Sequence, residues 1–508
     1  MPTVIRDLMS TPPVQADGDD TLASVARRMA DANIGSVIIA EGADVVGIVT
    51  ERDLLRAAAV DRDPSTEPAR RWMTASPDVL GPDEEAGVAW SNLSDHHYRH
   101  LPVVSDGALV GVVSLRDLMG IARLRPADET SEDVPRGLEG VVVADTAVGD
   151  VRGLEGFFHY RQYSAVELAA HRSLEDVWFL MAEGALPTGE QSEAFVRRTA
   201  ELRSIPPGLS ALLPALAGLG QPLDVLRTAV SVLGGELAWL PTHDGDPHQL
   251  AEQALQLCAV VPSILTATYR LRQGLAVIPP RSDLAYAANY LWMLTGVEPI
   301  AAQARALEQY LMLTIDHGFN SSTFTARVIT STGADLAAAI CGAIGALSGP
   351  LHGGAPSRAL DMLDAIGTPE NAEAWVRDAV EHGGRIMGFG HRVYKTDDPR
   401  SLFLRDVACQ MDAPLVDFAT QVEQTVVDVL AELKPGRRLY ANVEFYAGVV
   451  MAACGVTREM FTPTFAASRT IGWTTHVVEQ AGHNRLIRPA ARYVGPVPPQ
   501  PVPPLAPR

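Results

Sequence analysis

Residues 386–400 of the chain read I-M-G-F-G-H-R-V-Y-K-T-D-D-P-R. The glycines at 388 and 390 would let the backbone approach a bulky ligand closely, because glycine carries no side chain. His391 follows them as a candidate acid or base, and Arg400 offers a fork of N–H donors that suits a carboxylate. A lone histidine beside glycines is more often a turn residue, so this stretch needs support from the rest of the chain.

Three further motifs in the same part of the chain supply that support. They read T-I-D-H-G-F-N-S-S-T-F-T-A-R at 314–327, G-P-L-H-G-G-A at 349–355 and N-V-E-F-Y-A-G at 442–448. Taken alone, Glu444 in the last motif is best interpreted as a structural carboxylate, since buried acidic side chains are rare and usually paired. Together with histidines beside glycines, it forms a better acid–base set than chance usually supplies.

The segment that contains these motifs is predicted to be mostly α-helical. It is rich in Ala and Leu, with apolar stretches such as A-Y-A-A-N-Y-L-W-M-L at 285–294 and little strand alternation. The most apolar run, Leu336–Leu347, is too short to span a bilayer and is predicted to be a buried helix.

Composition limits the class of protein. A chain of 508 residues is too long for one core, and 47% hydrophobic with 20% charged residues is typical of globular proteins. A net charge of −20 argues against nucleic acid or an anionic membrane as the main partner. The four cysteines lack C-x-x-C spacing, so we expect reduced core thiols, no metal site and, with no signal peptide visible at Met1–Leu8, a cytoplasmic protein.

The first 125 residues contain a tandem repeat. M-S-T-P-P-V at Met9 recurs as M-T-A-S-P-D-V at Met73, and G-I-V-T-E-R-D ending at Asp53 recurs as G-V-V-S-L-R-D ending at Asp117. In the first copy the pattern predicts a helix from Leu22, strands at 36–39 and 45–50, and a helix from residue 51. Thr50 and Ser114 then fall at helix starts, where capping alone can explain a hydroxyl and an acid.

The recurrence of the motif resembles a tandem pair of CBS domains, a Bateman module, which usually binds adenine nucleotides. The resemblance implies that the hydroxyl and arginine of each motif contact phosphate and that the aspartate accepts hydrogen bonds from a ribose. Only the second copy carries basic side chains, Arg99 and His100, before its strand. A polyphosphate is therefore expected to bind mainly where these two side chains lie. The nucleotide-binding residues implied are Thr50, Arg52, Asp53, Arg99, His100, Ser114, Arg116 and Asp117.

The large segment resembles citrate synthase. The resemblance rests on the four motifs above and on G-L-E-G-V-V-V-A-D-T-A at 137–147, P-L-D-V-L-R-T-A-V-S at 222–231 and F-T-P-T-F-A-A-S-R-T-I-G-W at 461–473. It implies a fold of large and small helical subdomains, at least a homodimer, and an acyltransferase that condenses acetyl-CoA with oxaloacetate in the tricarboxylic acid cycle. No tightly bound cofactor or metal is implied.

The resemblance also implies roles for individual residues. His352 would stabilise the enol of the thioester, Glu444 would remove the α-proton, and His391 would polarise the oxaloacetate carbonyl. Oxaloacetate would be bound by His317, Arg400, Arg469 and Arg488, with one arginine from the partner subunit. CoA would lie against Ile386, Met387, Gly388, Phe389 and Gly390.

One departure from the family's pattern affects the base itself, because the family's usual aspartate is Glu444 here. Two alternatives therefore stay open: a 2-methylcitrate synthase that uses propionyl-CoA, and a nucleotide sensor without catalytic activity. The retained histidines and arginines speak against the second alternative.

The expected organisation is an N-terminal α+β pair followed by the helical catalytic domain, with allosteric control by ATP, ADP or AMP. The predicted boundaries are CBS domains at 1–62 and 63–125, a polar, proline-bounded linker at 126–136, the catalytic domain at 137–492 and a proline-rich tail at 493–508.

Overall fold

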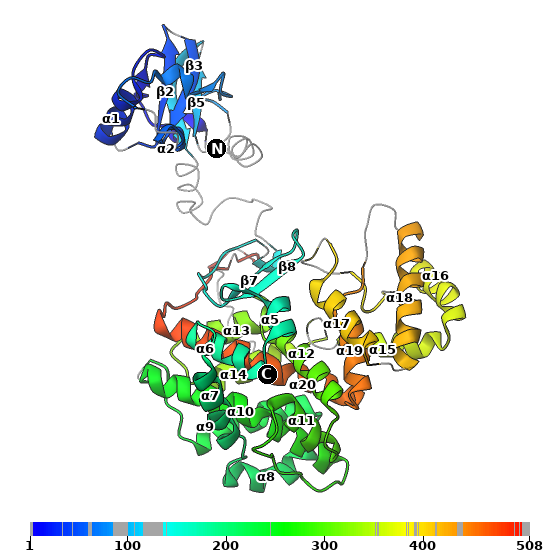
Figure 1. The fold of residues 1–508 in the computed structure, drawn as a ribbon. Coiled ribbons are helices and arrows are strands. Elements are labelled where there is room, and N and C mark those ends of the chain that lie inside the picture. Colours follow the sequence, from blue (N-terminus) through cyan, green and yellow to red (C-terminus); the bar gives the residue numbers. More distant parts are fainter. Residues whose placement is uncertain are drawn as a thin grey trace, which may run out of the picture. The chain divides into compact units, whose positions relative to one another are not determined.

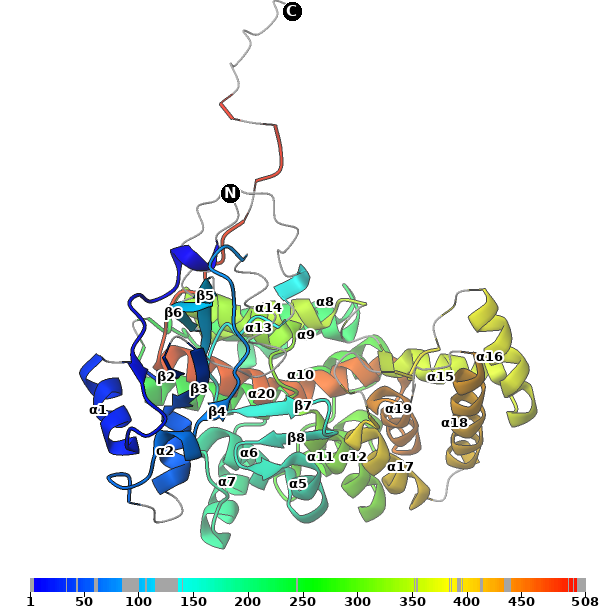
Figure 2. The ribbon, with the colours of Figure 1, turned by 90° about the horizontal axis from the view of Figure 1, so that it is seen from above.

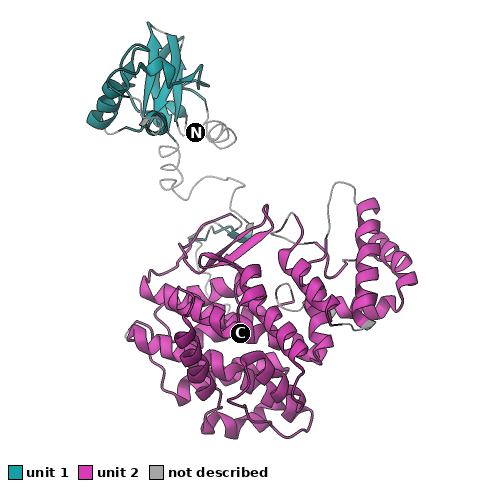
Figure 3. Ribbon diagram, viewed as in Figure 1, with its two compact units in different colours: residues 1–139, 491–508 teal, residues 140–490 magenta. Residues whose placement is uncertain are grey.

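The fold was analysed in a computed structural model of the whole chain (Figure 1). The structure describes every residue except 1–3, 33, 43, 59–62, 85–99, 106, 115–135, 139, 244, 351, 353–354, 383, 385, 391–393, 395, 412–413, 434–439, 492, 497 and 500–508. The chain divides into two compact units, residues 1–139 with 491–508 and residues 140–490 (Figure 3). Each is described by itself.

The first repeat copy folds as its periodicity predicts. Helix α1 (Leu22–Ala32) buries Leu22, Val25 and Met29 against a sheet in the order β1-β2-β3-β4. The elements are β1 (Gln15–Ala16), β2 (Ser36–Glu41), β3 (Asp44–Thr50), α2 (Glu51–Ala58) and β4 (Thr74–Ala75), with short 3₁₀ turns at Ile5–Asp7 and Ala69–Arg71. The predicted helix starts and both predicted strands are confirmed.

The described part of the second copy is the antiparallel pair β5 (His100–Ser105) and β6 (Ala108–Ser114). The two copies exchange their leading segments. Met9 packs on Gly111 of β6, and Met73 packs on Gly47 of β3, so closely that a Cβ on either glycine would overlap the methionine sulfur. The repeat units of the sequence are therefore intertwined in space.

The second unit is a helical domain, as predicted. Its helices are α5 (Ala165–His171), α6 (Leu174–Glu183), α7 (Gly189–Glu201), α8 (Pro207–Ala217), α9 (Pro222–Glu236), α10 (Pro247–Arg272), α11 (Tyr286–Thr295), α12 (Ala301–Thr314), α13 (Ser321–Ser331), α14 (Leu336–Leu347), α15 (Ala355–Ile366), α16 (Ala372–Glu381), α17 (Pro399–Cys409), α18 (Pro414–Leu433), α19 (Val443–Ala453) and α20 (Phe461–Gly482), with 3₁₀ turns at Arg136–Leu138 before it and at Pro369–Asn371 and Arg458–Met460 within it.

Helices α10 and α20 run side by side through the middle of this domain (Figure 2). Helix α10 is long and apolar enough to cross a membrane, but 72% of its most apolar window is buried inside the protein. Helix α20 buries Trp473, Arg469 and His476 almost completely, so it carries polar side chains into the core. Helices α15 to α19 form a separate group at one side of the domain in both views.

Two features differ from the sequence predictions. A small antiparallel sheet precedes the helices, with β7 (Gly149–Arg152), β8 (Phe157–Tyr160) and β9 (Tyr163–Ser164). It was missed because its alternation is only four residues long, although Phe158 and Tyr160 are buried on alternate positions of β8. Cys409 is exposed at the end of α17, so it is not a core thiol as expected, whereas Cys258 and Cys454 are buried.

Candidate active site

An arginine–carboxylate pair marks one side of the site. Asp398 caps α17 by accepting the Arg400 N–H at 3.0 Å, with Pro399 at the first helical position. The same carboxylate accepts Nε and Nη2 of Arg400 at 3.0 and 2.8 Å, and both side chains are buried. The guanidinium is thus oriented by a two-point contact within its own helix turn.

Glu444 lies in the first turn of α19, where Asn442 caps the helix by accepting the Glu444 N–H at 3.1 Å. Asp398 ties this helix start to α17, because its Oδ2 accepts the Val443 N–H at 3.1 Å. Burial raises the pKa of the Glu444 carboxyl to about 7, although the charge of Arg400 acts in the opposite direction. A half-buried carboxylate with this pKa can exchange a proton near neutral pH.

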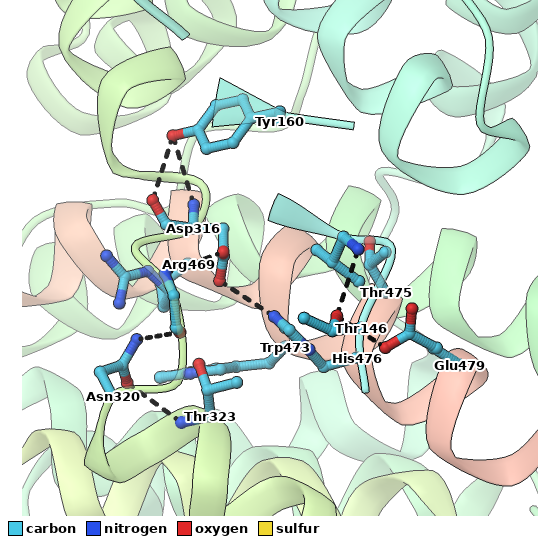
Figure 4. Close-up of polar contacts among 12 residues, drawn as sticks. Thr146, Tyr160, Asp316, Asn320, Thr323, Arg469, Trp473, Thr475, His476 and Glu479 are labelled. Atoms are coloured by element: carbon cyan, nitrogen blue, oxygen red, sulfur yellow. Dashed lines mark hydrogen bonds and ion pairs between the residues drawn. The ribbon is translucent and has the colours of Figure 1, made fainter. Parts of the chain in front are cut away.

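Two aromatic rings connect Arg400 with His317. The guanidinium lies over Phe158 at 5.8 Å and over Tyr394 at 5.7 Å. His317 packs against the same two rings, and its Nε2 lies 3.0 Å from Tyr394 Oη. The loop that carries His317 follows α12. Tyr160 Oη lies 2.9 Å from the Met312 carbonyl oxygen of α12 and 3.2 Å from the Asp316 carbonyl oxygen of the loop, and Figure 4 shows its contact with Asp316.

Arg469 enters the site from the buried face of α20. Its Nε donates to the Thr314 carbonyl at 2.8 Å, and its guanidinium lies 4.6 Å from the centre of the Phe465 ring. Its charge also affects His352, whose pKa is lowered to about 4 by burial and by Arg469. His352 is therefore neutral at physiological pH.

A hydroxyl group positions the His352 ring. Ser322 Oγ lies 2.8 Å from His352 Nε2 and accepts the indole N–H of Trp473 at 3.1 Å. The Ser322 proton goes either to the histidine or to Asn320 Oδ1, which lies 2.8 Å away and already accepts two backbone N–H groups. When the histidine receives it, the ring proton of His352 resides on Nδ1.

Backbone conformation and packing within the protein explain the glycines at 388 and 390. Both have positive φ angles, 81° and 79°, and a Cβ on Gly388 would lie 3.1 Å from the Phe445 side chain. The segment pairs with the residues before Glu444, since Asn442 N donates to the Gly388 carbonyl at 2.8 Å. Their close approach is therefore to α19, while contact with CoA stays a prediction.

Some predicted residues are not placed with this group. His391 lies outside the described residues, as do Arg99, Arg116 and Asp117 of the N-terminal motif. Arg488 is exposed beyond the end of α20 and has no hydrogen bond or ion pair with any residue that the structure describes. The structure brings together Arg400, Glu444 and His317, and the charge of Arg469 acts on both Arg400 and His352.

In the N-terminal unit, the first motif is ordered around its aspartate. Asp53 is buried, and its Oδ2 accepts the Thr50 N–H and hydroxyl at 2.9 and 2.7 Å, while Oδ1 accepts Arg56 Nη2 at 2.8 Å. The ring of His100, from the second copy, covers Gly35 of the first copy, 3.3 Å from where a Cβ would lie. An imidazole from one copy thus lies beside the motif of the other.

Sequence reasoning missed four side chains that build the site: Asp398, Tyr394, Ser322 and Trp473. Asp398 had a recognisable signal, because Asp-Pro-Arg supplies a helix cap, a proline at the first helical position and an arginine at the second. The contact of Trp473 with Ser322 spans 151 residues of sequence, and no local pattern predicts it.

The family model described as "Citrate synthase, C-terminal domain" matches residues 137–490. The chain belongs to the citrate synthase family. The CBS domain model matches twice in the N-terminal unit, at 5–60 and 69–123, so a tandem CBS pair precedes the citrate synthase domain. The family, the fold and acyl transfer are therefore established.

Relatives within the citrate synthase family have both names considered above. A citrate synthase from Deinococcus radiodurans is 36% identical over 72% of this chain and 96% of its own length. A 2-methylcitrate synthase from Mycobacterium tuberculosis is 38% identical over 73% and 93%. The citrate synthase of Thermoplasma acidophilum, solved with carboxymethyl coenzyme A and oxaloacetate, matches with a TM-score of 0.68 and 28% identity over 73% of this chain and 99% of that one.

Proposed function

We propose that this chain condenses acetyl-CoA with oxaloacetate and releases citrate and CoA, under the control of an adenine nucleotide bound to the CBS pair. The observation that carries the catalytic part is that the Glu444 carboxyl, whose helix start is tied to the Asp398–Arg400 pair, has a pKa near 7, while His352, whose ring contacts Ser322, is neutral. The first can accept a proton at neutral pH, and the second can donate a hydrogen bond without a net charge.

The reaction begins with removal of the acetyl α-proton by Glu444. Such a proton is far too weakly acidic for a bare carboxylate, so the charge that develops on the thioester oxygen must be met at the same time. The N–H at Nδ1 of His352 meets it when Ser322 donates to Nε2. One hydrogen-bond donor at a developing oxyanion is worth roughly 3 kcal/mol or more.

Oxaloacetate is held by the buried Arg400 and Arg469 while the enolate carbon attacks its ketone carbonyl, and water then cleaves the citryl thioester to give citrate and CoA. The carboxylates of a dicarboxylate suit two fixed guanidinium groups. His391 would polarise the oxaloacetate carbonyl, and residues 386–390 would contact CoA.

Arg488 is exposed in the single chain, which fits a residue offered to a second subunit, so we expect at least a homodimer. The four free cysteines fit a reducing, cytoplasmic location.

The alternative substrate is propionyl-CoA, because relatives of similar identity are named citrate synthase and 2-methylcitrate synthase. The two activities differ by one methyl group, and a methylene in an apolar pocket discriminates by only about 10- to 200-fold. Side-by-side kcat/KM values for the two thioesters, with oxaloacetate saturating, decide between them. A higher value for propionyl-CoA would replace the proposed substrate.

Glu444 should give the reaction a pH dependence. The base must be ionised, and a pKa of about 7 means that its ionised fraction falls about tenfold for each pH unit below 7. We expect kcat/KM for acetyl-CoA to rise from about pH 5.5 to 7.5 and then to level off. His352 does not titrate in this window, because its pKa is about 4. A flat profile would argue against Glu444 as the base.

The CBS pair should bind an adenine nucleotide at the Thr50–Asp53 motif and its counterpart at 114–117. Asp53 is held in place by Thr50 and by the exposed Arg56, which a ribose hydroxyl would replace at Oδ1, and His100 supplies a neighbouring cation when protonated. Calorimetry with ATP, ADP and AMP should detect binding that Asp53→Ala, Asp117→Ala or Arg99→Ala weakens by roughly tenfold or more. Absence of heat with all three would leave an S-adenosyl ligand or a purely structural module.

Binding should also change catalysis. Coupling between sites is typically 1–3 kcal/mol, or roughly 5- to 150-fold in affinity. We expect a nucleotide-dependent shift in KM or kcat that disappears when residues 1–135 are deleted. Equal kinetics with and without saturating nucleotide would contradict allosteric control but not citrate synthase activity.

A further inference from the structure

A chain of buried polar contacts lies behind the loop that carries His317. Its members come from three places: Asp316 from that loop, Arg327 from α13, and His476 and Glu479 from α20. The side chains of Asp316, Arg327 and His476 are each 1 to 2% exposed, and that of Glu479 is 19% exposed. Polar groups buried this deeply are costly unless they are paired, so the contacts between them are informative.

The contacts join Glu479 to Asp316 through Arg327 and His476. Glu479 forms an ion pair with Arg327 Nη2. Arg327 Nε donates to His476 Nδ1 at 3.3 Å, and His476 Nε2 lies 3.2 Å from Asp316 Oδ1. Figure 4 shows the His476 ring directed at Asp316 from α20. The residue that follows Asp316 in the chain is His317 of the candidate site.

The protonation states follow from the donors. Arginine has no acceptor, so His476 Nδ1 must accept from Arg327, and the proton of a neutral imidazole resides on Nε2, where it is donated to Asp316. Asp316 Oδ2 accepts the Gly318 N–H at 3.1 Å, so both carboxylate oxygens hold the loop. Burial raises the pKa of Asp316, but His476, Arg469 and the Gly318 N–H outweigh it and the net shift is downward.

At its other end, this series of contacts reaches Thr146 and Ala147, in the segment that leads into the catalytic domain. Glu479 Oε2 accepts the Thr146 hydroxyl at 2.8 Å, and Oε1 accepts the Ala147 N–H at 2.7 Å. These residues follow the predicted linker and lead directly into β7 (Gly149–Arg152). Glu479 Oε2 thus contacts both Thr146 and Arg327, while Oε1 holds the Ala147 N–H.

We propose that Glu479 is a positioning residue for oxaloacetate binding: through Arg327 and His476 it fixes the Asp316–His317 loop to the entry segment at Thr146–Ala147. The inference rests on the proposed function, since it assigns His317 to the oxaloacetate pocket. Glu479 touches no substrate in this account, and its effect should therefore be selective for one substrate. The reason is that residues 386–390 and Glu444, on the thioester side, make no described contact with this chain of residues.

The test is Glu479→Gln in the full chain, which keeps the shape and removes the charge. The dissociation constant of oxaloacetate, measured by calorimetry, and its KM should both rise by roughly 3- to 30-fold, while the KM for acetyl-CoA stays within about twofold. Thr146→Val, which removes one of the two contacts to the entry segment, should shift both values in the same direction by less. Glu252→Gln is the matched control, because Glu252 forms an exposed pair with Arg198 at 2.8 Å and should change neither value.

A double variant separates positioning from a merely structural role. Glu479→Gln leaves Arg327 buried without its carboxylate, and Arg327→Met in the same chain removes that unpaired charge, so the double variant should recover thermal stability. If Glu479 positions the loop, the double variant regains Tm but still binds oxaloacetate weakly. Recovery of normal oxaloacetate affinity together with Tm would overturn the inference, as would an equal loss for both substrates in the single variant.

Failure of the proposed function gives a different pattern. If wild-type protein binds oxaloacetate but releases no CoA from acetyl- or propionyl-CoA, the proposed reaction is wrong, and calorimetry still tests the role of Glu479. If wild-type protein does not bind oxaloacetate, the inference is contradicted together with the proposed function.

Discussion

Replacing Glu444 by Gln should lower kcat by roughly 10²- to 10⁴-fold, because the amide keeps the shape of the side chain and cannot accept the α-proton. Oxaloacetate should still bind, since its arginines are untouched and Arg400 stays paired with Asp398. The measurement is kcat with both substrates saturating, together with the oxaloacetate dissociation constant by calorimetry. Both are needed, because a misfolded site would lose both.

The matched control for this variant is Glu432→Gln. Glu432 is an exposed carboxylate on α18, paired with Arg377 at 2.5 Å, and its loss should leave kcat unchanged. A Glu444→Gln enzyme with near-normal kcat would return Glu444 to the role of a structural carboxylate.

Glu444→Asp tests whether the pocket is adapted to the longer side chain. Compared with the aspartate that the family resemblance implies at this position, the extra methylene moves the carboxylate by about 1 Å, and a misplacement of this size can cost around 10²-fold. The start of α19 is fixed by Asn442 and by the contact of Val443 with Asp398, so the pocket has a defined geometry. We expect the aspartate variant to be slower. A faster variant would show that the glutamate is a handicap.

Replacing His352 by Ala should lower kcat by roughly 10²- to 10³-fold, the usual cost of removing one donor from a developing oxyanion. The loss should fall on kcat, because the hydrogen bond strengthens only as charge builds on the thioester oxygen. Ser322→Ala should produce a smaller loss of the same kind. Ser322 acts through the orientation and tautomer of the imidazole, which lies 2.8 Å from its hydroxyl.

The control for the histidine is His382→Ala, since His382 is exposed at the end of α16 and should not affect kcat. A His352→Ala variant whose KM for acetyl-CoA rises while kcat stays constant would contradict the assigned role. It would make His352 a group that binds the ground state and the transition state equally.

The helical class and the first CBS copy could be predicted from periodicity, because long apolar patterns such as that of 336–347 determine burial locally. The small sheet β7–β9 could not, since a four-residue alternation is too short to distinguish from a loop. The proximity of Arg400 and Glu444 could not be predicted from local sequence patterns either. It depends on Asp398 joining the starts of α17 and α19, and only the family resemblance placed those two residues in one site.

The buried polar residues behind the site show the same limit. Arg327 is the last residue of the 314–327 motif, and the motif alone predicts no role for it. Its burial follows from partners on α20 that lie about 150 residues further along the chain. In contrast, Arg488 was predicted to bind substrate and is exposed in the single chain, so its role stays a prediction.

Oxaloacetate-dependent release of CoA from acetyl-CoA by the full chain, followed with a thiol reagent, tests the proposed reaction most directly, with Glu444→Gln as the matched inactive protein. We predict steady release that requires oxaloacetate, yields citrate and falls by at least about 10²-fold in the variant. Release of no CoA from either acetyl-CoA or propionyl-CoA by wild-type protein that binds oxaloacetate would contradict it.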